Sequence, residues 1–248
     1  MKRSLSTCLL SIPLFLSLQS CGGDFDFGDV TPGLYRLSYE RSAPVSRLSI
    51  TGEIMIEVQE DGDVNFSIYD VIEGGATGSG TIDPGGDFTL TTGGLPRGDG
   101  LNVTIEGGIN GTGKGATVDA TVSGDITANV EGGYHSDGAE NPYNSDYDGT
   151  FVGDFTQPFD MDVFTDGHVT GSFIDAQKDI WTATGTVNNV GYGTIVFTPS
   201  PTAGRGLAEQ ITMTGFFTLP NGWPRANGTY TGFVGSGSVG GDWSAFYD

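Results

Sequence analysis

Cysteine is almost absent from this chain: its 248 residues contain only Cys8 and Cys21. Cys8 lies in a stretch that is typical of a cleaved export signal, so the exported protein would keep Cys21 alone. A single cysteine forms no internal disulfide, which excludes the small disulfide-rich folds of secreted proteins. The fold therefore depends on its hydrophobic core, and the remaining cysteine needs a separate explanation.

Basic residues are also scarce. Ten Lys and Arg stand against 31 Asp and Glu, with two histidines. Loss of the first 20 residues, which include Lys2 and Arg3, leaves a formal charge of −23. So acidic a surface repels nucleic acid and anionic lipid headgroups, and we expect no nucleic-acid partner. It suits solubility, cation binding or basic partners.

Helical periodicity and recognisable catalytic motifs are missing as well. From Gly33 onward, apolar residues do not recur at helical spacing, and no Ser–His–Asp set, zinc motif or phosphate loop is present. His135 and His168 lie beside a predicted linker and a predicted turn, where exposed side chains are expected. We therefore predict that the protein is not an enzyme. The abundant carboxylates leave a glycan-acting enzyme as the alternative.

The first 20 residues (1–20) predict a signal peptide. Lys2 and Arg3 precede an apolar stretch over 9–16, which is shorter than the roughly 20 residues that span a bilayer. Residues 21–32 are rich in Gly and Asp and predict a flexible tether.

The run Leu18, Gln19 and Ser20 directly before Cys21 resembles the lipobox of bacterial lipoproteins. The resemblance implies that the signal is cut before Cys21, and that this cysteine and the new amino terminus are acylated. Several acyl chains anchor a protein stably, whereas one chain holds it only marginally. The same resemblance implies the outer membrane, because Gly22 follows the cysteine instead of an Asp. The alternative is an ordinary signal peptide with a chance cysteine.

Alternating apolar and polar residues predict half-buried strands along the rest of the chain. The clearest examples are 54–59, 64–69, 101–106, 126–130, 159–163, 181–187, 211–217 and 243–247. Short Asp-Gly and Asn-Gly turns lie between such strands, at 60–63, 165–168 and 220–222, and supply the positive φ of tight hairpins. We predict an all-β fold of antiparallel meanders.

The pattern repeats at an offset of 105 residues, where 56–67 align without gaps on 161–172. Three shorter segments extend the alignment: 80–82 on 185–187, 87–90 on residues from 193 after a small insertion, and 33–35 on 149–151. Such a repeat predicts two tandem copies of one module. The alternative is that two unrelated series of hairpins look alike.

The modules are expected over 33–134 and 147–248, joined by a polar linker, 135–146, that contains Pro and Gly. Eight antiparallel strands in each can close into a barrel, which leaves no exposed edge, or can fold as a two-sheet β-sandwich. We favour two small barrels. A single outer-membrane pore is disfavoured, because many strands are shorter than the roughly 9–11 residues of a membrane strand.

Glycine-spaced strands agree with small barrels. The motif over 147–155, with echoes at 228–232 and 240–243, resembles the barrel domains of bacterial surface lipoproteins such as transferrin-binding protein B. The resemblance implies architecture alone, and it carries over no binding residue.

One constellation predicts a weak calcium site. Asn144, Asp146 and Asp148, followed by Gly149, match the first half of a calcium loop, in which alternating oxygen ligands and a glycine bend surround the ion. Asp154 would supply the distal carboxylate one position early. No other cofactor is expected. The alternative is a solvated linker that runs into a strand.

Together these features predict a lipid-anchored protein of the cell envelope, in the outer membrane or on the surface, with a non-enzymatic binding or structural role. Its partners would be the membrane, through Cys21, and a protein or small-molecule ligand that the sequence does not identify. Trp223, Tyr143 and Tyr147 lie near predicted loops and are candidate contacts. A calcium-stabilised adhesin is the further alternative.

Overall fold

The computed structural model describes residues 30–42, 49–93, 101–200, 209–235 and 237–248. The predicted signal peptide and Cys21 with its lipobox lie outside these residues, as does most of the predicted tether. Within the described ranges, no helix has the length and apolar character needed to cross a membrane.

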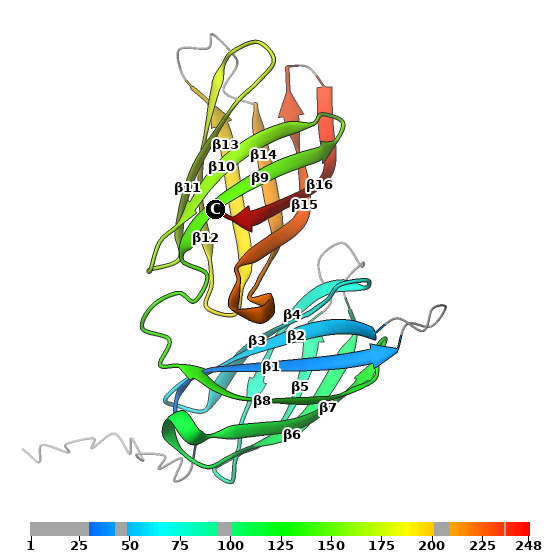
Figure 1. Cartoon of the computed structure of the whole chain (residues 1–248), viewed down its shortest axis with the longest axis vertical. Coiled ribbons are helices and arrows are strands. Elements are labelled where there is room, and N and C mark those ends of the chain that lie inside the picture. The colour runs from blue at the N-terminus through cyan, green and yellow to red at the C-terminus, as the bar shows by residue number, and fades with distance from the viewer. Residues whose placement is uncertain (1–29, 43–48, 94–100, 201–208, 236) are drawn as a thin grey trace, which may run out of the picture.

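The described residues form sixteen strands in two closed antiparallel barrels (Figure 1), and strands that follow one another in the chain are neighbours in the sheet. Barrel 1 consists of β1 (Gly33–Ser42), β2 (Ser49–Val58), β3 (Asp63–Asp70), β4 (Gly74–Thr81), β5 (Asp87–Gly93), β6 (Val103–Asn110), β7 (Thr117–Gly124) and β8 (Ala128–Ser136). Barrel 2 consists of β9 (Ser145–Gly153), β10 (Gln157–Val163), β11 (His168–Ile174), β12 (Ile180–Val187), β13 (Tyr192–Pro199), β14 (Gln210–Thr218), β15 (Arg225–Val234) and β16 (Gly237–Tyr247). The predicted all-β fold of two eight-stranded meander barrels is confirmed, and the sandwich alternative is wrong because each sheet closes on itself.

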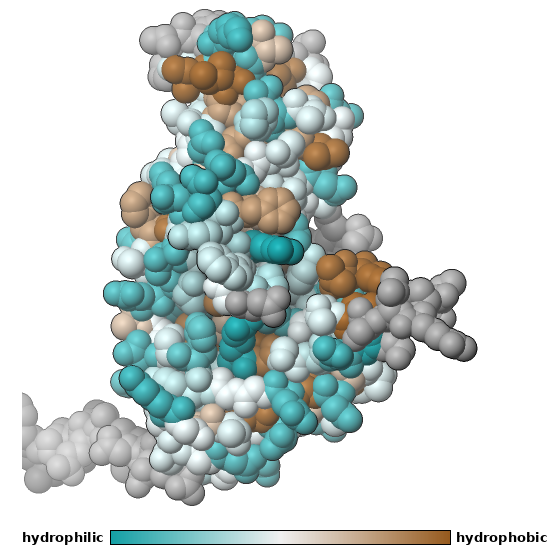
Figure 2. Space-filling model, viewed as in Figure 1, coloured by the Kyte–Doolittle hydropathy of each residue, from teal (hydrophilic) through white to brown (hydrophobic). Residues whose placement is uncertain are grey.

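Side chains alternate between the barrel interior and the outer wall. In β3, Val64, Phe66 and Ile68 are buried inside, whereas Asn65 and Tyr69 lie on the partly exposed outer face. Figure 2 shows one side of the molecule as mostly hydrophilic or intermediate, with apolar residues in separate small patches. A membrane pore needs a continuous outward apolar band, and the side shown in Figure 2 presents no such band.

The β2–β3 turn of barrel 1 and the β10–β11 turn of barrel 2 match in detail at the predicted offset. Gly62 and Gly167 adopt φ values of 84° and 78°, which favour glycine. The amide of Ile82 donates to the carbonyl oxygen of Gly62 at 3.0 Å, and the amide of Val187 donates to that of Gly167 at 2.8 Å. The same bonds at the same spacing support two copies of one module.

The predicted insertion in the second copy is wrong. In the β4–β5 turn the amide of Gly86 donates to the carbonyl oxygen of Asp83, and in the β12–β13 turn the amide of Gly191 donates to that of Asn188. Both pairs are 105 residues apart, so the offset continues through this turn without a gap. The glycine pattern shifted the predicted alignment by one residue, because at this offset residue 87 corresponds to 192 and not to 193.

The predicted match of 33–35 with 149–151 is also wrong. Tyr35 pairs with Ile56 across β1 and β2, and Tyr147 pairs with Met161 across β9 and β10, so Tyr35 corresponds to Tyr147. Each tyrosine hydroxyl donates to the carbonyl oxygen four residues earlier, at 2.5 Å and 2.7 Å. The first strands of the two copies, β1 and β9, therefore correspond at a different sequence offset from the 105 residues that relate the later hairpins.

The barrel limits differ from the predicted ones by a few residues. β8 continues through His135 to Ser136, and β9 begins at Ser145, so the connecting segment is 137–144. At the other end, Val30 is buried in the core of barrel 1, and the hydroxyl oxygen of Thr31 accepts a hydrogen bond from the amide of Gly113 at 2.6 Å. Barrel 1 therefore begins inside the predicted tether.

Both interiors are filled by side chains. In barrel 2 the ring of Phe151 lies 4.7 Å from that of Phe159 and 5.0 Å from that of Tyr230, measured between centroids. A Cβ atom at Gly149 would lie 2.1 Å from the Phe159 ring, so glycine is what lets this ring cross the strand. An eight-stranded barrel is just wide enough for such filling.

A buried carboxylate secures one end of barrel 1. Asp70, the last residue of β3, is fully buried and accepts hydrogen bonds from Arg41 at 2.8 Å and 2.9 Å and from the Tyr39 hydroxyl at 3.0 Å. The amides of Ile72 and Glu73 donate to it as well. Burial by itself raises the pKa of Asp70, but the hydrogen bonds from Arg41 and the two amides outweigh this effect and leave the pKa below its ordinary value.

Replacing Asp70 by Asn is therefore expected to destabilise the protein by about 3 kcal/mol at pH 7, because the Arg41 guanidinium loses its buried counter-charge. A carboxyl with a lowered folded-state pKa stabilises the fold above its unfolded-state pKa and loses this effect as the pH falls. The gap between wild type and Asp70→Asn should therefore narrow from pH 7 to about pH 3 in chemical denaturation. Glu106→Ala, an exposed carboxylate on β6, is the control, and an equal loss there would contradict the assignment.

Candidate functional site

Two clefts lie where the barrels meet, outside both filled interiors. One end of barrel 2 packs against the side wall of barrel 1, and the strands of the two barrels run in clearly different directions (Figure 1). The wall is formed by the outer faces of β1, β2 and β3, and the end of barrel 2 is formed by its turns. The junction positions the walls of both clefts.

The centre of the junction is apolar. Leu34 and Met55 point outward from barrel 1, yet they are 0% and 1% exposed and belong to the core cluster of barrel 2. Val190 in the β12–β13 turn, Leu219 after β14 and Tyr143 in the connecting segment belong to the same cluster. The two barrels therefore share one continuous apolar contact.

An ion pair borders this apolar contact. The guanidinium of Arg36 lies 2.8 Å from a carboxylate oxygen of Glu53 and also donates to the carbonyl oxygen of Leu219. The other carboxylate oxygen of Glu53 accepts a hydrogen bond from the amide of Leu219 at 3.1 Å. Two side chains of barrel 1 thus satisfy both backbone groups of one residue in barrel 2.

Further hydrogen bonds hold the β12–β13 turn against the wall. The side-chain amide of Asn189 donates to Glu57 at 2.8 Å, and the hydroxyl of Ser67 donates to the carbonyl oxygen of Val190. On the other side of the junction, the side-chain amide of Asn227 donates to the hydroxyl of Tyr69 at 2.7 Å. These bonds fix the distance between the two walls of each cleft.

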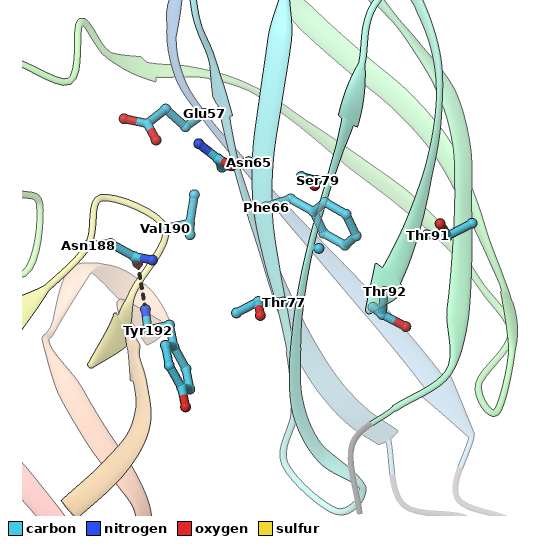
Figure 3. Close-up of a pocket in the computed structure, with 11 residues that line it drawn as sticks. Glu57, Asn65, Phe66, Thr77, Ser79, Thr91, Thr92, Asn188, Val190 and Tyr192 are labelled. Atoms are coloured by element: carbon cyan, nitrogen blue, oxygen red, sulfur yellow. Dashed lines mark hydrogen bonds between the residues drawn. The ribbon is translucent and has the colours of Figure 1, made fainter. Parts of the chain in front are cut away.

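The first cleft, which we call the hydroxyl cleft, has a volume of about 670 Å³. Figure 3 shows Asn188, Val190 and Tyr192 of barrel 2 on one side and the side chains of β3, β4 and β5 on the other. The barrel 1 wall carries mainly hydroxyl and amide groups, from Asn65, Thr77, Ser79, Thr91 and Thr92. Glu57 is the charged side chain among its described lining residues.

The second cleft, which we call the charged cleft, has a volume of about 740 Å³. Arg36, Glu53, His135 and Arg225 line it, together with tyrosines of barrel 1. The pKa of His135 is lowered, first by desolvation at the cleft wall and then by the positive charge of Arg36, while Glu53 raises it. The guanidinium of Arg225 lies 5.6 Å from the ring centre of Phe246, so it is already stacked on this ring.

The predicted calcium residues do not converge in the structure. Asp146 and Asp148 project from the same outer face of β9, which is an extended strand and not a loop that could wrap an ion. Asn144 precedes the strand and donates to the carbonyl oxygen of Asn141, and Asp154 follows it and accepts from the amide of Gly240. No group of three or more His, Cys, Asp or Glu side chains in the described chain is arranged to hold a metal ion. Calcium binding at these residues stays a prediction.

The same strand contributes to a row of facing carboxylates. Asp146 lies opposite Asp162 and Asp148 opposite Asp160, all on the exposed face of β9 and β10. The pKa of Asp148 is raised, first by the charge of Asp248 and then by that of Asp160. Desolvation and the charge of Asp146 raise the pKa of Asp162. Like charges in such positions destabilise a sheet, so the row reflects the acidity of the surface.

The other residues singled out in the sequence lie apart from one another. His168 begins β11 and stacks on Phe164 on an exposed turn, in a different barrel from His135. Tyr143 and Tyr147 are 0% and 1% exposed, so they pack in the core and contact no ligand. Trp223 is 62% exposed, and its ring packs at a tilt against that of Tyr247, with 5.7 Å between centroids.

Sequence reasoning missed the cleft residues. The row Asn65, Ser79 and Thr91 looks like any outward polar face until a second barrel is placed beside it. One signal was present: Met55 is apolar in the polar phase of β2, where an exposed residue is expected, and Leu34 similarly flanks the buried Tyr35. Apolar residues on both phases of neighbouring strands indicate a wall that is covered on its outer side.

Glu53→Ala tests the junction. It removes the carboxylate partner of the Arg36 guanidinium and the acceptor of the Leu219 amide, and we expect a loss of about 1–3 kcal/mol in the contact between the barrels. Small-angle scattering should then give a larger radius of gyration, and proteolysis within 137–144 should be faster. Glu131→Ala, another carboxylate of the charged cleft, is the control; equal effects in the two variants would contradict a junction held by Glu53.

Comparisons with known proteins assign no family to this chain: no protein-family model matches it, and no curated protein matches its sequence. Among solved structures, a candidate outer membrane protein from Bacteroides fragilis aligns with 88% of this chain and 97% of its own, at 13% sequence identity and a TM-score of 0.26. A similarity of that strength carries no argument about function, which has to follow from the site itself.

Proposed function

We propose that the chain is a lipid-anchored protein of the bacterial envelope with a non-enzymatic binding role, and that its ligands bind in the clefts between the barrels. One observation carries the binding role. Both barrel interiors are filled, whereas the junction holds two open clefts with walls fixed by hydrogen bonds. Clefts between domains with a few convergent polar groups are common ligand sites.

Anchoring at Cys21 is supported by the lipobox resemblance of Leu18, Gln19 and Ser20. Val30 is already part of the barrel 1 core. The nine Cα–Cα steps from Cys21 to Val30 span at most about 32 Å when fully extended. On this proposal barrel 1 lies close to the membrane surface, and the clefts are held within reach of envelope components.

Catalysis is not part of the proposal. The facing carboxylates of β9 and β10 form acid pairs, but they lie on an exposed strand face. A glycosidase needs its two carboxyls to flank a bound sugar, which requires a cleft that positions the substrate. In the charged cleft, Glu53 is engaged by Arg36 and by the amide of Leu219.

The anchor is tested by Cys21→Ser. We expect the wild-type protein to fractionate with membranes and to show the mass of residues 21–248 plus acyl groups, because several acyl chains give stable membrane attachment. The variant should lose both the added mass and the membrane attachment. An unmodified wild-type chain, or membrane attachment that survives in the variant, would contradict the proposed lipid anchor at Cys21.

The binding role is tested by thermal melting of the detergent-solubilised full chain with chromatographic fractions of the envelope's water-soluble components. A ligand that binds the folded state raises the melting temperature, and we expect at least one fraction to do so by about 2 °C or more. Ser79→Trp fills the hydroxyl cleft and Ser38→Trp fills the charged cleft, so one of them should abolish the shift. Thr121→Trp, on the outer face of β7, is the control. A shift that persists in both cleft variants would place binding elsewhere.

A further inference from the structure

The charge of the hydroxyl cleft restricts its ligand. Among its described lining residues there is no Lys, Arg or His, and Glu57 is its one charged side chain. An oxygen of Glu57 already accepts a hydrogen bond from Asn189 at 2.8 Å. An anion would find no counter-charge here, in a protein whose net charge is −21. The cleft therefore disfavours an anionic ligand, and its other polar lining groups are uncharged.

The polar groups on the barrel 1 wall form a regular row. Asn65 on β3 lies directly opposite Ser79 on β4, and Ser79 lies directly opposite Thr91 on β5. Neighbouring strands are about 4.8 Å apart, so the row presents one hydroxyl or amide group per strand at that interval. Hydroxyl and amide groups both donate and accept hydrogen bonds, as each hydroxyl of a sugar does. Such a row matches a ligand with several hydroxyl groups.

The barrel 2 wall of the hydroxyl cleft contains an aromatic ring, that of Tyr192. Tyr192 is half-buried, and its ring packs edge-on against that of Phe216, with 5.4 Å between centroids. The Tyr192 amide donates to the side chain of Asn188 at 2.8 Å, which fixes the start of β13 (Figure 3). A sugar ring has a rim of hydroxyls and an apolar C–H face. The polar row and the tyrosine ring are complementary to these two parts.

We propose that the hydroxyl cleft binds a neutral saccharide, with Asn65, Ser79 and Thr91 bonding its hydroxyls and Tyr192 contacting its C–H face. This inference rests on the proposed binding function and names the ligand class of one of its two clefts. The cleft volume of about 670 Å³ lies within the range of small-molecule sites and accommodates a short oligosaccharide. The hydrogen bond from Ser67 to Val190 holds the two walls in place before the ligand arrives, which lowers the entropic cost of binding.

The experiment is ligand-observed NMR on the detergent-solubilised full chain, by saturation transfer. The probes are maltotriose, cellotriose, laminaritriose, mannotriose and chitotriose, with trigalacturonic acid as an anionic probe of similar size. We expect at least one neutral trisaccharide to bind, with a dissociation constant of about 1 mM or below. Thr91→Ala should weaken it about tenfold, and Ser79→Trp should abolish it. Thr121→Ala, which removes an outward hydroxyl from β7 of the same barrel, should leave it unchanged.

Three results would overturn the inference: no neutral trisaccharide binds, trigalacturonic acid binds better than all of them, or binding survives in Ser79→Trp. These results are separate from the test of the binding function. If an envelope fraction stabilises the wild type but not Ser79→Trp, while no neutral trisaccharide binds, the ligand class is wrong and the cleft remains a binding site. If no fraction gives a shift that depends on either cleft, the proposed function itself fails.

Discussion

The burial of Leu34 and Met55 is the contact on which the rest of the arrangement depends. Both side chains point away from the core of their own barrel and are covered by the turns of barrel 2. Full burial of such a side chain contributes roughly 1.5–3 kcal/mol. The pair Arg36 and Glu53 borders this apolar centre. It fixes the orientation of one barrel relative to the other, because it forms hydrogen bonds with both backbone groups of Leu219. Apolar burial thus joins the barrels, and the polar bonds around it set their orientation and give the clefts fixed walls.

Because side chains fill both barrel interiors, a ligand has to bind outside them. Aromatic side chains reach across the sheets where a neighbouring strand has glycine, as Phe159 does over Gly149. The same device operates between the barrels: a Cβ atom at Gly75 of barrel 1 would lie 2.4 Å from the Phe216 ring of barrel 2. Phe216 in turn supports Tyr192 in the hydroxyl cleft. The high glycine content therefore serves close packing within the barrels and between them.

The two copies have diverged at one turn with a structural consequence. The β4–β5 turn of barrel 1 and the β12–β13 turn of barrel 2 share the same hydrogen bonds at an offset of 105 residues. In the first copy this turn contains the exposed Gly85. The second copy has Val190 at the corresponding position, and this side chain is buried against barrel 1. A surface turn in one copy is thus a docking element in the other, which explains why similar modules can form a dissimilar pair.

The sequence by itself determined the strands, the hairpin turns and the repeat, because these follow from local alternation and from the positive φ of residues such as Gly62 and Gly167. It favoured barrels but left a sandwich open, and the tertiary structure decided that each sheet closes on itself. The sequence misaligned the first strands of the two copies, because Gly33 and Gly149 look alike, whereas Gly33 pairs with Val58 and Gly149 pairs with Phe159, which are not corresponding residues. It also predicted a calcium loop where the chain continues as strand β9. Only the tertiary structure decided the clefts. Their residues come from two barrels and meet because an outward apolar pair is covered, and no local pattern specifies which surface will cover it.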